Sequence, residues 1–365
     1  MKYVHVCAGK SQAVLDAQKE VPRRGGMYNN LRMFDGEIKA YDEIDDFSQY
    51  DVVQVNMSPV DQNLIQDIRR RLGPSSNTML VLNNDYVAET WDGFQMHPRV
   101  YEANMRCADM LFSTEPYQVS NMLPGTFVLP HPHMIKTLKH MKTPETQDVM
   151  GLFFHWWEGK TNHAEKVLRW LKESGFNIKS KVFAYKADRD TDKRWGATYF
   201  DDYLPMMTYP DFIQEVLRCK LCYDFTGYHT YGRNSVDNAA LGIPTIGTDR
   251  VESMRRCFPN LICDPFNIKG TFDIAKRVLT DDKWRQEQID YAKQASEFYN
   301  YKNSKARFLA ALKIAKFNGG NLFYKNVRWN SKGMAIPKDL EFDKSILLEE
   351  RWKEEKEWRK QREGI

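Results

Sequence analysis

The stretch from His229 to Thr248 restricts the possible folds of this chain more than any other part of the sequence. It follows an apolar run at 221–225, which has the composition of a buried strand. Gly232 allows a tight turn with exposed backbone, and Asn234 or Ser235 is the residue expected to cap a helix that starts after the turn. The stretch therefore predicts a strand, a glycine turn and a helix in succession.

The same stretch predicts where this helix ends and what its start can bind. Gly242 followed by Pro244 should end the helix before a short apolar strand at 245–248. The first N–H groups of a helix lack partners and the helix dipole is positive there, so a helix start beneath a glycine turn favours phosphate. We interpret the turn as an anion site. An ordinary loop between two elements of an α/β sheet is the alternative interpretation.

The residues from 229 to 244 also resemble a known motif. In many retaining glycosyltransferases of the GT-B fold, the nucleotide-sugar site carries the pattern E-x7-E followed by A-x-A-x-G-x-P. Asp237-Asn-Ala-Ala-Leu-Gly-Ile-Pro244 matches the second acid and the residues after it, and His229 stands where the first Glu would be. The chain thus resembles the family 4-like members, with H-x7-D in place of E-x7-E.

This resemblance implies roles for individual residues. Asp237 stands for the Glu that binds the ribose hydroxyls, and His229 for the Glu that contacts the donor sugar. Backbone N–H groups from Gly232 to Asn234, with Arg233 as an added charge, would hold the diphosphate. An imidazole carries no fixed negative charge near neutral pH, so His229 leaves the identity of the donor sugar open.

Strand and helix patterns alternate along the first part of the chain. Apolar runs predict strands at 3–8, 51–57, 78–82, 110–113 and 127–129, and helices are expected at 61–72 and 98–107. This alternation predicts a doubly wound parallel sheet. Pro22, Gly25 and Gly26 resemble the P-x2-G-G loop after the family's first strand, where bare backbone lets donor and acceptor approach; a plain turn is the alternative.

Two further segments lie at expected strand ends in this half. Ligands of parallel α/β sheets bind beyond the carboxyl ends of the strands, so Asp85, after the strand at 78–82, is the candidate base near the acceptor hydroxyl. His131 and His133 have i, i+2 spacing, but no acidic residue or cysteine lies near them in the sequence. We interpret His131-Pro-His133 as a rigid exit from the first domain and not as a metal site.

A second alternating set follows a polar linker at 137–149. Strands are expected at 150–155, 182–185, 221–225, 245–248 and 261–263, and helices at 162–174, 210–218, 271–279 and 283–298. Lys160 resembles the lysine that holds the diphosphate in the family, while the family's arginine is missing unless His155, Arg189 or Arg233 supplies its charge. A solvated lysine is the alternative.

Asp188-Arg-Asp190-Thr-Asp192 has the spacing of a metal-binding loop. Lys193 stands where a calcium loop needs glycine, and GT-B enzymes generally need no such metal. We interpret the segment as a solvated loop and expect no metal and no cofactor other than the nucleotide sugar.

These patterns divide the chain into an acceptor-side domain at 1–140, a nucleotide-sugar-binding domain at 141–318 and a charged helical tail at 319–365. The end of the tail, 343–365, is rich in i,i+4 opposite charges. The resemblance implies that the last helix crosses back to the first domain, where Ile346, Leu347 and Trp352 would cover apolar surface. A helix that binds a partner or a membrane surface is the alternative.

Composition limits the possible partners and compartment. Residues 1–145 carry 15 Lys and Arg against 18 Asp and Glu, which argues against a broad nucleic-acid-binding face there. The six cysteines are expected to be free and buried, including Cys219 and Cys222 in a single C-x2-C. The first residues form a strand and not a signal peptide, and no run approaches the ~18 apolar residues of a membrane span. We expect a cytoplasmic protein, with peripheral membrane attachment as the alternative.

The sequence therefore predicts a GT-B glycosyltransferase with two Rossmann-like domains facing a cleft. It would move a sugar from a UDP- or GDP-sugar to an acceptor hydroxyl with retention of configuration, with His229 and Asp85 as candidate catalytic residues. A glycan, a lipid-linked glycan, a protein, a small molecule and a modified DNA base all remain open as acceptors. The alternative is a non-catalytic module that binds a nucleotide sugar or a nucleic acid. An NAD-linked oxidoreductase is disfavoured because no G-x-G-x-x-G follows the first strand.

Overall fold

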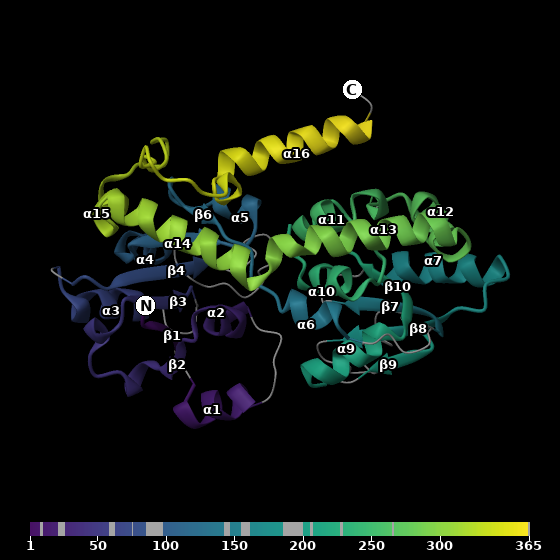
Figure 1. Cartoon of the computed structure of the whole chain (residues 1–365), viewed down its shortest axis with the longest axis horizontal. Coiled ribbons are helices and arrows are strands. Elements are labelled where there is room, and N and C mark those ends of the chain that lie inside the picture. The colour runs from purple at the N-terminus through teal and green to yellow at the C-terminus, as the bar shows by residue number, and fades with distance from the viewer. Residues whose placement is uncertain are drawn as a thin grey trace. The chain divides into compact units, whose positions relative to one another are not determined.

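The computed structural model describes residues 1–7, 10–20, 26–57, 63–74, 76–84, 98–141, 147–154, 161–184, 200–204, 207–226, 229–264 and 266–363. It divides into two compact units (Figure 1). Unit 1 comprises Met1–Pro132 and Tyr301–Ile365, and unit 2 comprises His133–Asn300.

Unit 1 is built on a six-stranded sheet in the order β2-β1-β3-β4-β5-β6, and every pair of neighbours is parallel. Its strands are β1 (Tyr3–Cys7), β2 (Glu37–Ala40), β3 (Val52–Asn56), β4 (Met79–Asn84), β5 (Met110–Ser113) and β6 (Phe127–Val128). Neighbouring residues of a strand face opposite sides, as in β4, where Leu80 and Leu82 enter one core and Val81 the other. Such strands, buried on both faces, are typical of doubly wound sheets.

Helices cover both faces of this sheet. They are α1 (Gln12–Glu20), α2 (Gly26–Phe34), α3 (Leu64–Leu72), α4 (Pro98–Cys107), α5 (Pro116–Ser120), α14 (Tyr301–Phe317), α15 (Asn321–Asn326) and α16 (Leu348–Glu363). Leu15 of α1, Phe34 of α2 and Phe308 of α14 share one core, while Ile68 of α3 and Tyr324 of α15 belong to the other. Helices from the end of the chain thus complete both cores of unit 1.

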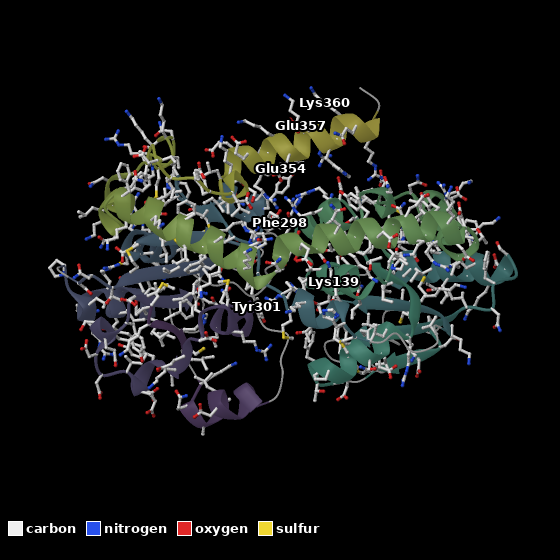
Figure 2. All side chains as sticks on the ribbon, in the orientation of Figure 1. Lys139, Phe298, Tyr301, Glu354, Glu357 and Lys360 are labelled. Atoms are coloured by element: carbon white, nitrogen blue, oxygen red, sulfur yellow. The ribbon has the colours of Figure 1, made fainter. Side chains whose placement is uncertain are left out.

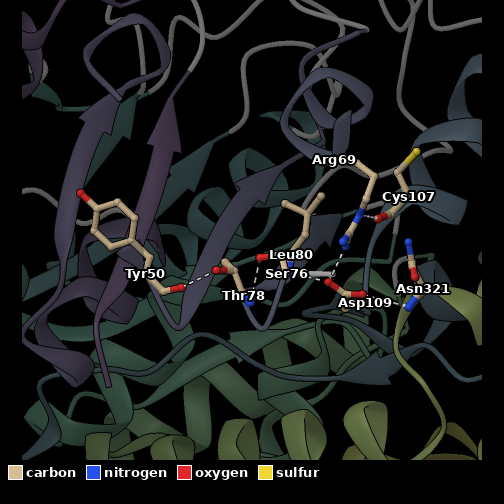
Figure 3. Close-up of polar contacts among 8 residues, drawn as sticks. All are labelled: Tyr50, Arg69, Ser76, Thr78, Leu80, Cys107, Asp109 and Asn321. Atoms are coloured by element: carbon tan, nitrogen blue, oxygen red, sulfur yellow. Dashed lines mark hydrogen bonds and ion pairs between the residues drawn. The ribbon is translucent and has the colours of Figure 1, made fainter. Parts of the chain in front are cut away.

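Asp109 ties three segments of unit 1 together (Figure 3). Its Oδ2 accepts hydrogen bonds from the Leu80 N–H at 2.8 Å and from the Arg69 guanidinium, and its Oδ1 accepts one from the Asn321 N–H at 3.0 Å. Arg69 also donates to the Cys107 carbonyl at 2.8 Å. A buried carboxylate with three donors fixes α3, β4 and α15 against one another.

The last helix, α16, packs on α5 within unit 1. The Trp352 ring meets the edge of Tyr117 at 4.6 Å between centroids, and the Tyr117 hydroxyl donates to Glu355 Oε1 at 2.8 Å. Ile346, just before α16, is fully buried in the core that contains Phe308. The opposite side of α16 carries charged side chains such as Glu354, Glu357 and Lys360 (Figure 2), so this helix has one docked face and one solvated face.

Unit 2 is built on a five-stranded parallel sheet in the order β11-β10-β7-β8-β9. Its strands are β7 (Gln147–Phe154), β8 (Lys179–Ala184), β9 (Asp202–Leu204), β10 (Cys219–Asp224) and β11 (Thr245–Gly247). Its helices are α6 (Ile135–Lys139), α7 (Thr161–Glu173), α9 (Tyr209–Leu217), α10 (Arg233–Leu241), α11 (Glu252–Cys257), α12 (Ile268–Thr280) and α13 (Asp282–Ala295).

The expected doubly wound α/β architecture is confirmed in both units, with differences of detail. The strand β2 was not expected, and the segment expected as a strand at 261–263 forms only an isolated bridge, between Ile262 and Gly247. The units also divide at other positions than the expected 140 and 318. Residues 133–140 lie in unit 2, and residues 301–318 lie in unit 1 because α14 packs into its core.

The two cysteines of the C-x2-C motif are buried in the core of unit 2. Cys219 and Cys222 are free, fully buried thiols of β10, and both lie close to Gly151 of β7, where a side chain would collide with their sulfur atoms. Among the described residues, no group of three or more His, Cys, Asp or Glu side chains is arranged to hold a metal ion. The pair therefore acts as small apolar core residues.

Candidate functional site

The turn before α10 is the centre of the candidate site in unit 2. Gly232 has φ +79°, in the left-handed region that favours glycine, and a Cβ at this position would lie 2.1 Å from Val251 Cγ1 and 2.5 Å from Ser253 Oγ. The Ser253 hydroxyl donates to the Gly232 carbonyl at 2.7 Å. The turn therefore requires glycine, both for its backbone conformation and for the close approach of α11.

The helix that follows starts differently from the prediction. Its N-cap is Gly232, which has no side chain to cap the helix, so the expected cap by Asn234 or Ser235 is wrong. The Ser235 hydroxyl instead donates to Asp224 Oδ2 at 3.0 Å, because Ser235 faces the end of β10. The predicted end is correct, since Gly242 is the C-cap with φ +78°. A helix start without a side-chain cap offers its N–H groups and its dipole to an anion.

Asp237 and His133 form a buried pair next to this turn. Asp237 is the fifth residue of α10 and therefore begins its second turn. Its Oδ1 lies 2.7 Å from His133 Nδ1, and the side chains of Asp237 and His133 are 0% and 3% exposed. The segment with His133, interpreted from sequence as a rigid domain exit, thus contributes an imidazole to the site.

His133 is held on its other side by the end of unit 2. Its backbone N–H donates to the Tyr299 carbonyl at 2.8 Å, and it forms a parallel bridge with Asn300. The Tyr299 hydroxyl donates to Glu252 Oε2 of α11 at 3.1 Å, and its ring lies 5.7 Å from that of Tyr231, next to Gly232. The Glu252 N–H donates to the Thr230 carbonyl at 2.9 Å, which closes the network around the turn.

Close to the chain ends of unit 2, surface contacts support the same region. Lys139 of α6 pairs with Glu297 at 2.6 Å, and the Arg256 guanidinium lies 3.8 Å from the ring centre of Phe298 (Figure 2). The lysine contact lowers the pKa of the Glu297 carboxyl. These pairs are more exposed than the His133–Asp237 pair, and each contributes little to stability.

The carboxyl end of β10 carries an aromatic stack that sequence reasoning missed. His163, in the first turn of α7, stacks on Phe225 at 4.4 Å, and Phe225 stacks on Tyr223 at 4.7 Å. The Tyr223 hydroxyl and His163 Nδ1 are hydrogen-bonded to each other, and burial lowers the pKa of His163 to about 4. The only sequence signal was a histidine in the first turn of the helix that follows β7, which is the position where a ligand-binding side chain is expected.

Some of the remaining predicted site residues lie in the described part of the chain, and others lie outside it. His229 is half-buried, directly before the bridge between Thr230 and Val251. Arg233 and Asn234 are half-buried in the first turn of α10. Gly26 is the first residue of α2. Asp85, Lys160, Gly25, Pro22, His155, Arg189 and Asp188–Asp192 lie outside the described residues.

In unit 1, buried polar side chains lie on three central strands. His5, Gln54 and Asn83 are each at most 1% exposed and come from β1, β3 and β4. His5 and Gln54 are paired in the sheet register, the Tyr3 hydroxyl donates to Gln54 Oε1 at 2.6 Å, and Asn83 donates to Asn56 at 3.1 Å. Neither His5 nor Gln54 stands out in the sequence, because apolar residues surround both in their strands.

Solved structures with the same fold are glycosyltransferases. The chain is similar to an α-glucosyltransferase in complex with UDP, with a TM-score of 0.61, 10% identity, and coverage of 87% of this chain and 100% of that one. It is also similar to a trehalose-6-phosphate structure from E. coli bound with UDP-2-fluoro glucose (TM-score 0.60, 10% identity, 86% and 99% covered) and to a sucrose-phosphate synthase from Thermosynechococcus elongatus (0.53, 11%, 74% and 73%). The fold is therefore GT-B, as predicted.

Sequence comparisons do not place the chain in a known protein family. No protein-family model matches the chain, and no curated protein matches it. In the described part of the chain, no helix is long and apolar enough to cross a membrane.

Proposed function

We propose that this chain is a glycosyltransferase that moves a sugar from a UDP- or GDP-sugar to an acceptor hydroxyl, with retention of configuration. The observation that carries the proposal is the start of α10, an uncapped helix start behind a turn that only glycine fits, in a chain with the GT-B fold. The UDP in two of the similar structures supports a nucleotide donor.

The chemistry of sugar transfer requires a specific role from each part of this site. Breaking the anomeric C–O bond builds positive charge on the sugar and negative charge on the leaving diphosphate. In the proposal, the first N–H groups of α10 and the Arg233 guanidinium stabilise the diphosphate, with Lys160 as a further charge. His229 contacts the donor sugar, Gly25 and Gly26 leave space for the approach of donor and acceptor, and Asp85 is the base near the acceptor hydroxyl.

A turnover assay with radiolabelled UDP- and GDP-sugars tests this proposal. We expect Arg233→Ala and Lys160→Ala each to lower kcat/KM by about a hundredfold, because each removes a charge that stabilises the leaving group. Lys269→Ala, on the exposed face of α12, is the matched control and should leave turnover unchanged.

The rival function is a binding module without catalysis, which the imidazole at position 229 favours. It would be supported if the native chain bound nucleotide sugars without turnover and His229→Glu gained turnover. Normal turnover in both Arg233→Ala and Lys160→Ala would refute the site assignment.

A further inference from the structure

In the His133–Asp237 pair, the geometry defines which atom donates the hydrogen bond and which atom accepts it. A carboxylate can only accept a hydrogen bond, so His133 Nδ1, 2.7 Å from Asp237 Oδ1, carries the proton between them. In a neutral imidazole the other ring nitrogen, Nε2, then holds a lone pair and acts as an acceptor. Asp237 thereby fixes both the orientation and the tautomer of His133.

The Nε2 atom of His133 is the unusual part of this pair. It is buried, and it has no hydrogen-bond partner in the part of the chain that the structure describes. A buried acceptor without a donor destabilises the fold, so such an atom inside a well-packed region indicates a missing donor.

The surroundings of the ring indicate which donor is missing. The His133 ring centre lies 5.9 Å from that of Tyr231, the residue directly before Gly232 and the start of α10. In the proposed function, the diphosphate lies at that helix start, and the ribose is covalently attached to the diphosphate. The donor sugar and the ribose both carry hydroxyls that can donate a hydrogen bond, one at each end of the diphosphate. His229 is assigned to the sugar in the proposed function, which leaves the ribose hydroxyls for His133.

Asp237 is poorly suited to make this contact alone. One of its oxygens is already engaged by His133. It is also one methylene shorter than the Glu of the E-x7-E pattern. The imidazole extends the reach of the carboxylate by the width of a ring.

We propose that His133 Nε2 accepts a hydrogen bond from a ribose hydroxyl of the donor nucleotide, and that Asp237 is the positioning residue that holds the imidazole for this contact. The inference rests on the proposed function and replaces the direct contact between Asp237 and the ribose that the resemblance implies. It makes His133 the residue that distinguishes ribonucleotides from nucleotides without ribose hydroxyls.

Isothermal titration of the full-length chain with UDP and with 2′,3′-dideoxy-UDP tests the inference, with GDP and its dideoxy form in parallel. The native chain should bind the ribonucleotide about tenfold more tightly, the effect of one well-placed hydrogen bond. His133→Leu should bind both forms equally, with the affinity of the native chain for the dideoxy form. That unchanged affinity shows that the site is still folded.

Two further variants separate the contact from a purely structural role. His133→Gln can donate to Asp237 and accept from a hydroxyl, so it should keep part of the preference for ribose. Asp237→Asn should lose the preference, because a carboxamide can donate to Nδ1 and reverse the tautomer. If His133→Leu keeps the native preference, Nε2 is satisfied by an internal water and the inference is wrong, while the proposed function stands. If the native chain binds neither UDP nor GDP, both fail.

Discussion

At the scale of single residues, burial determines the charge of His5. This residue is the centre of β1 and is 1% exposed. Burial, with a smaller contribution from the nearby His131, lowers its pKa from 6.5 to about 3. The unfolded chain therefore binds a proton at His5 below pH 6.5, whereas the folded chain stays neutral there until about pH 3. The stability that His5 contributes is complete above pH 6.5 and is lost as the pH falls through this window.

Replacing His5 should flatten the dependence of stability on pH. Between pH 6.5 and pH 5, the native chain should lose about 2 kcal/mol more unfolding free energy than His5→Asn, at about 1.4 kcal/mol per pH unit. Urea unfolding at pH 7 and pH 5 measures both chains, and all other titrating groups are common to them. His140→Asn, at an exposed histidine, is the control and should follow the native chain. Equal losses in native chain and His5→Asn would show that His5 is protonated in the folded state.

At the scale of elements, two glycines with positive φ differ only in their surroundings. A Cβ at Gly232 would collide with Val251 and Ser253, whereas Gly175, with φ +90°, has no atom within 4 Å of the same position. We expect Gly175→Ala to cost about 1 kcal/mol from backbone strain alone, without a change in UDP affinity. Gly232→Ala should cost about 3 kcal/mol, because overpacking adds to strain, and should abolish UDP binding by displacing the start of α10. Thermal unfolding and UDP titration measure both, and equal effects of the two variants would contradict this account.

The elements also show how far the sequence could predict the molecule. Apolar runs predicted most of the strands, and Gly242 predicted the end of α10. Both signals depend only on residues that are close together in the sequence. The start of α10 was predicted with the wrong cap because the Ser235 hydroxyl bonds Asp224 at the end of β10, a contact that helix-capping patterns do not contain. The His133–Asp237 pair spans 104 positions and joins a segment interpreted as a rigid domain exit to the motif that contains Asp237. Such contacts follow from the topology and not from local propensity.

At the scale of the whole molecule, the cores of unit 1 are completed by helices that follow unit 2 in the sequence. Phe308, Ala311 and Ile314 of α14 fill one core of unit 1, and Tyr324 of α15 fills the other, although all four follow unit 2 in the sequence. Amphipathic periodicity shows that a helix packs on a sheet but not on which one. This is why the expected boundary at 318 differs from the observed crossing at Tyr301.

The same organisation predicts which fragments fold. Unit 2 is one continuous segment, so residues 133–300 should unfold cooperatively alone, whereas residues 1–132 should not, because they lack α14 and α15. The chain enters unit 2 at His133 and leaves it after Asn300, and these two points are adjacent. The His133 N–H donates to the Tyr299 carbonyl at 2.8 Å, and His133 forms a bridge with Asn300. A glycine-serine linker of about four residues should therefore join 1–132 to 301–365 and restore cooperative unfolding, measured by circular dichroism on heating. Cooperative unfolding of 1–132 alone would mean that the helices after Tyr301 cover a core that is already complete.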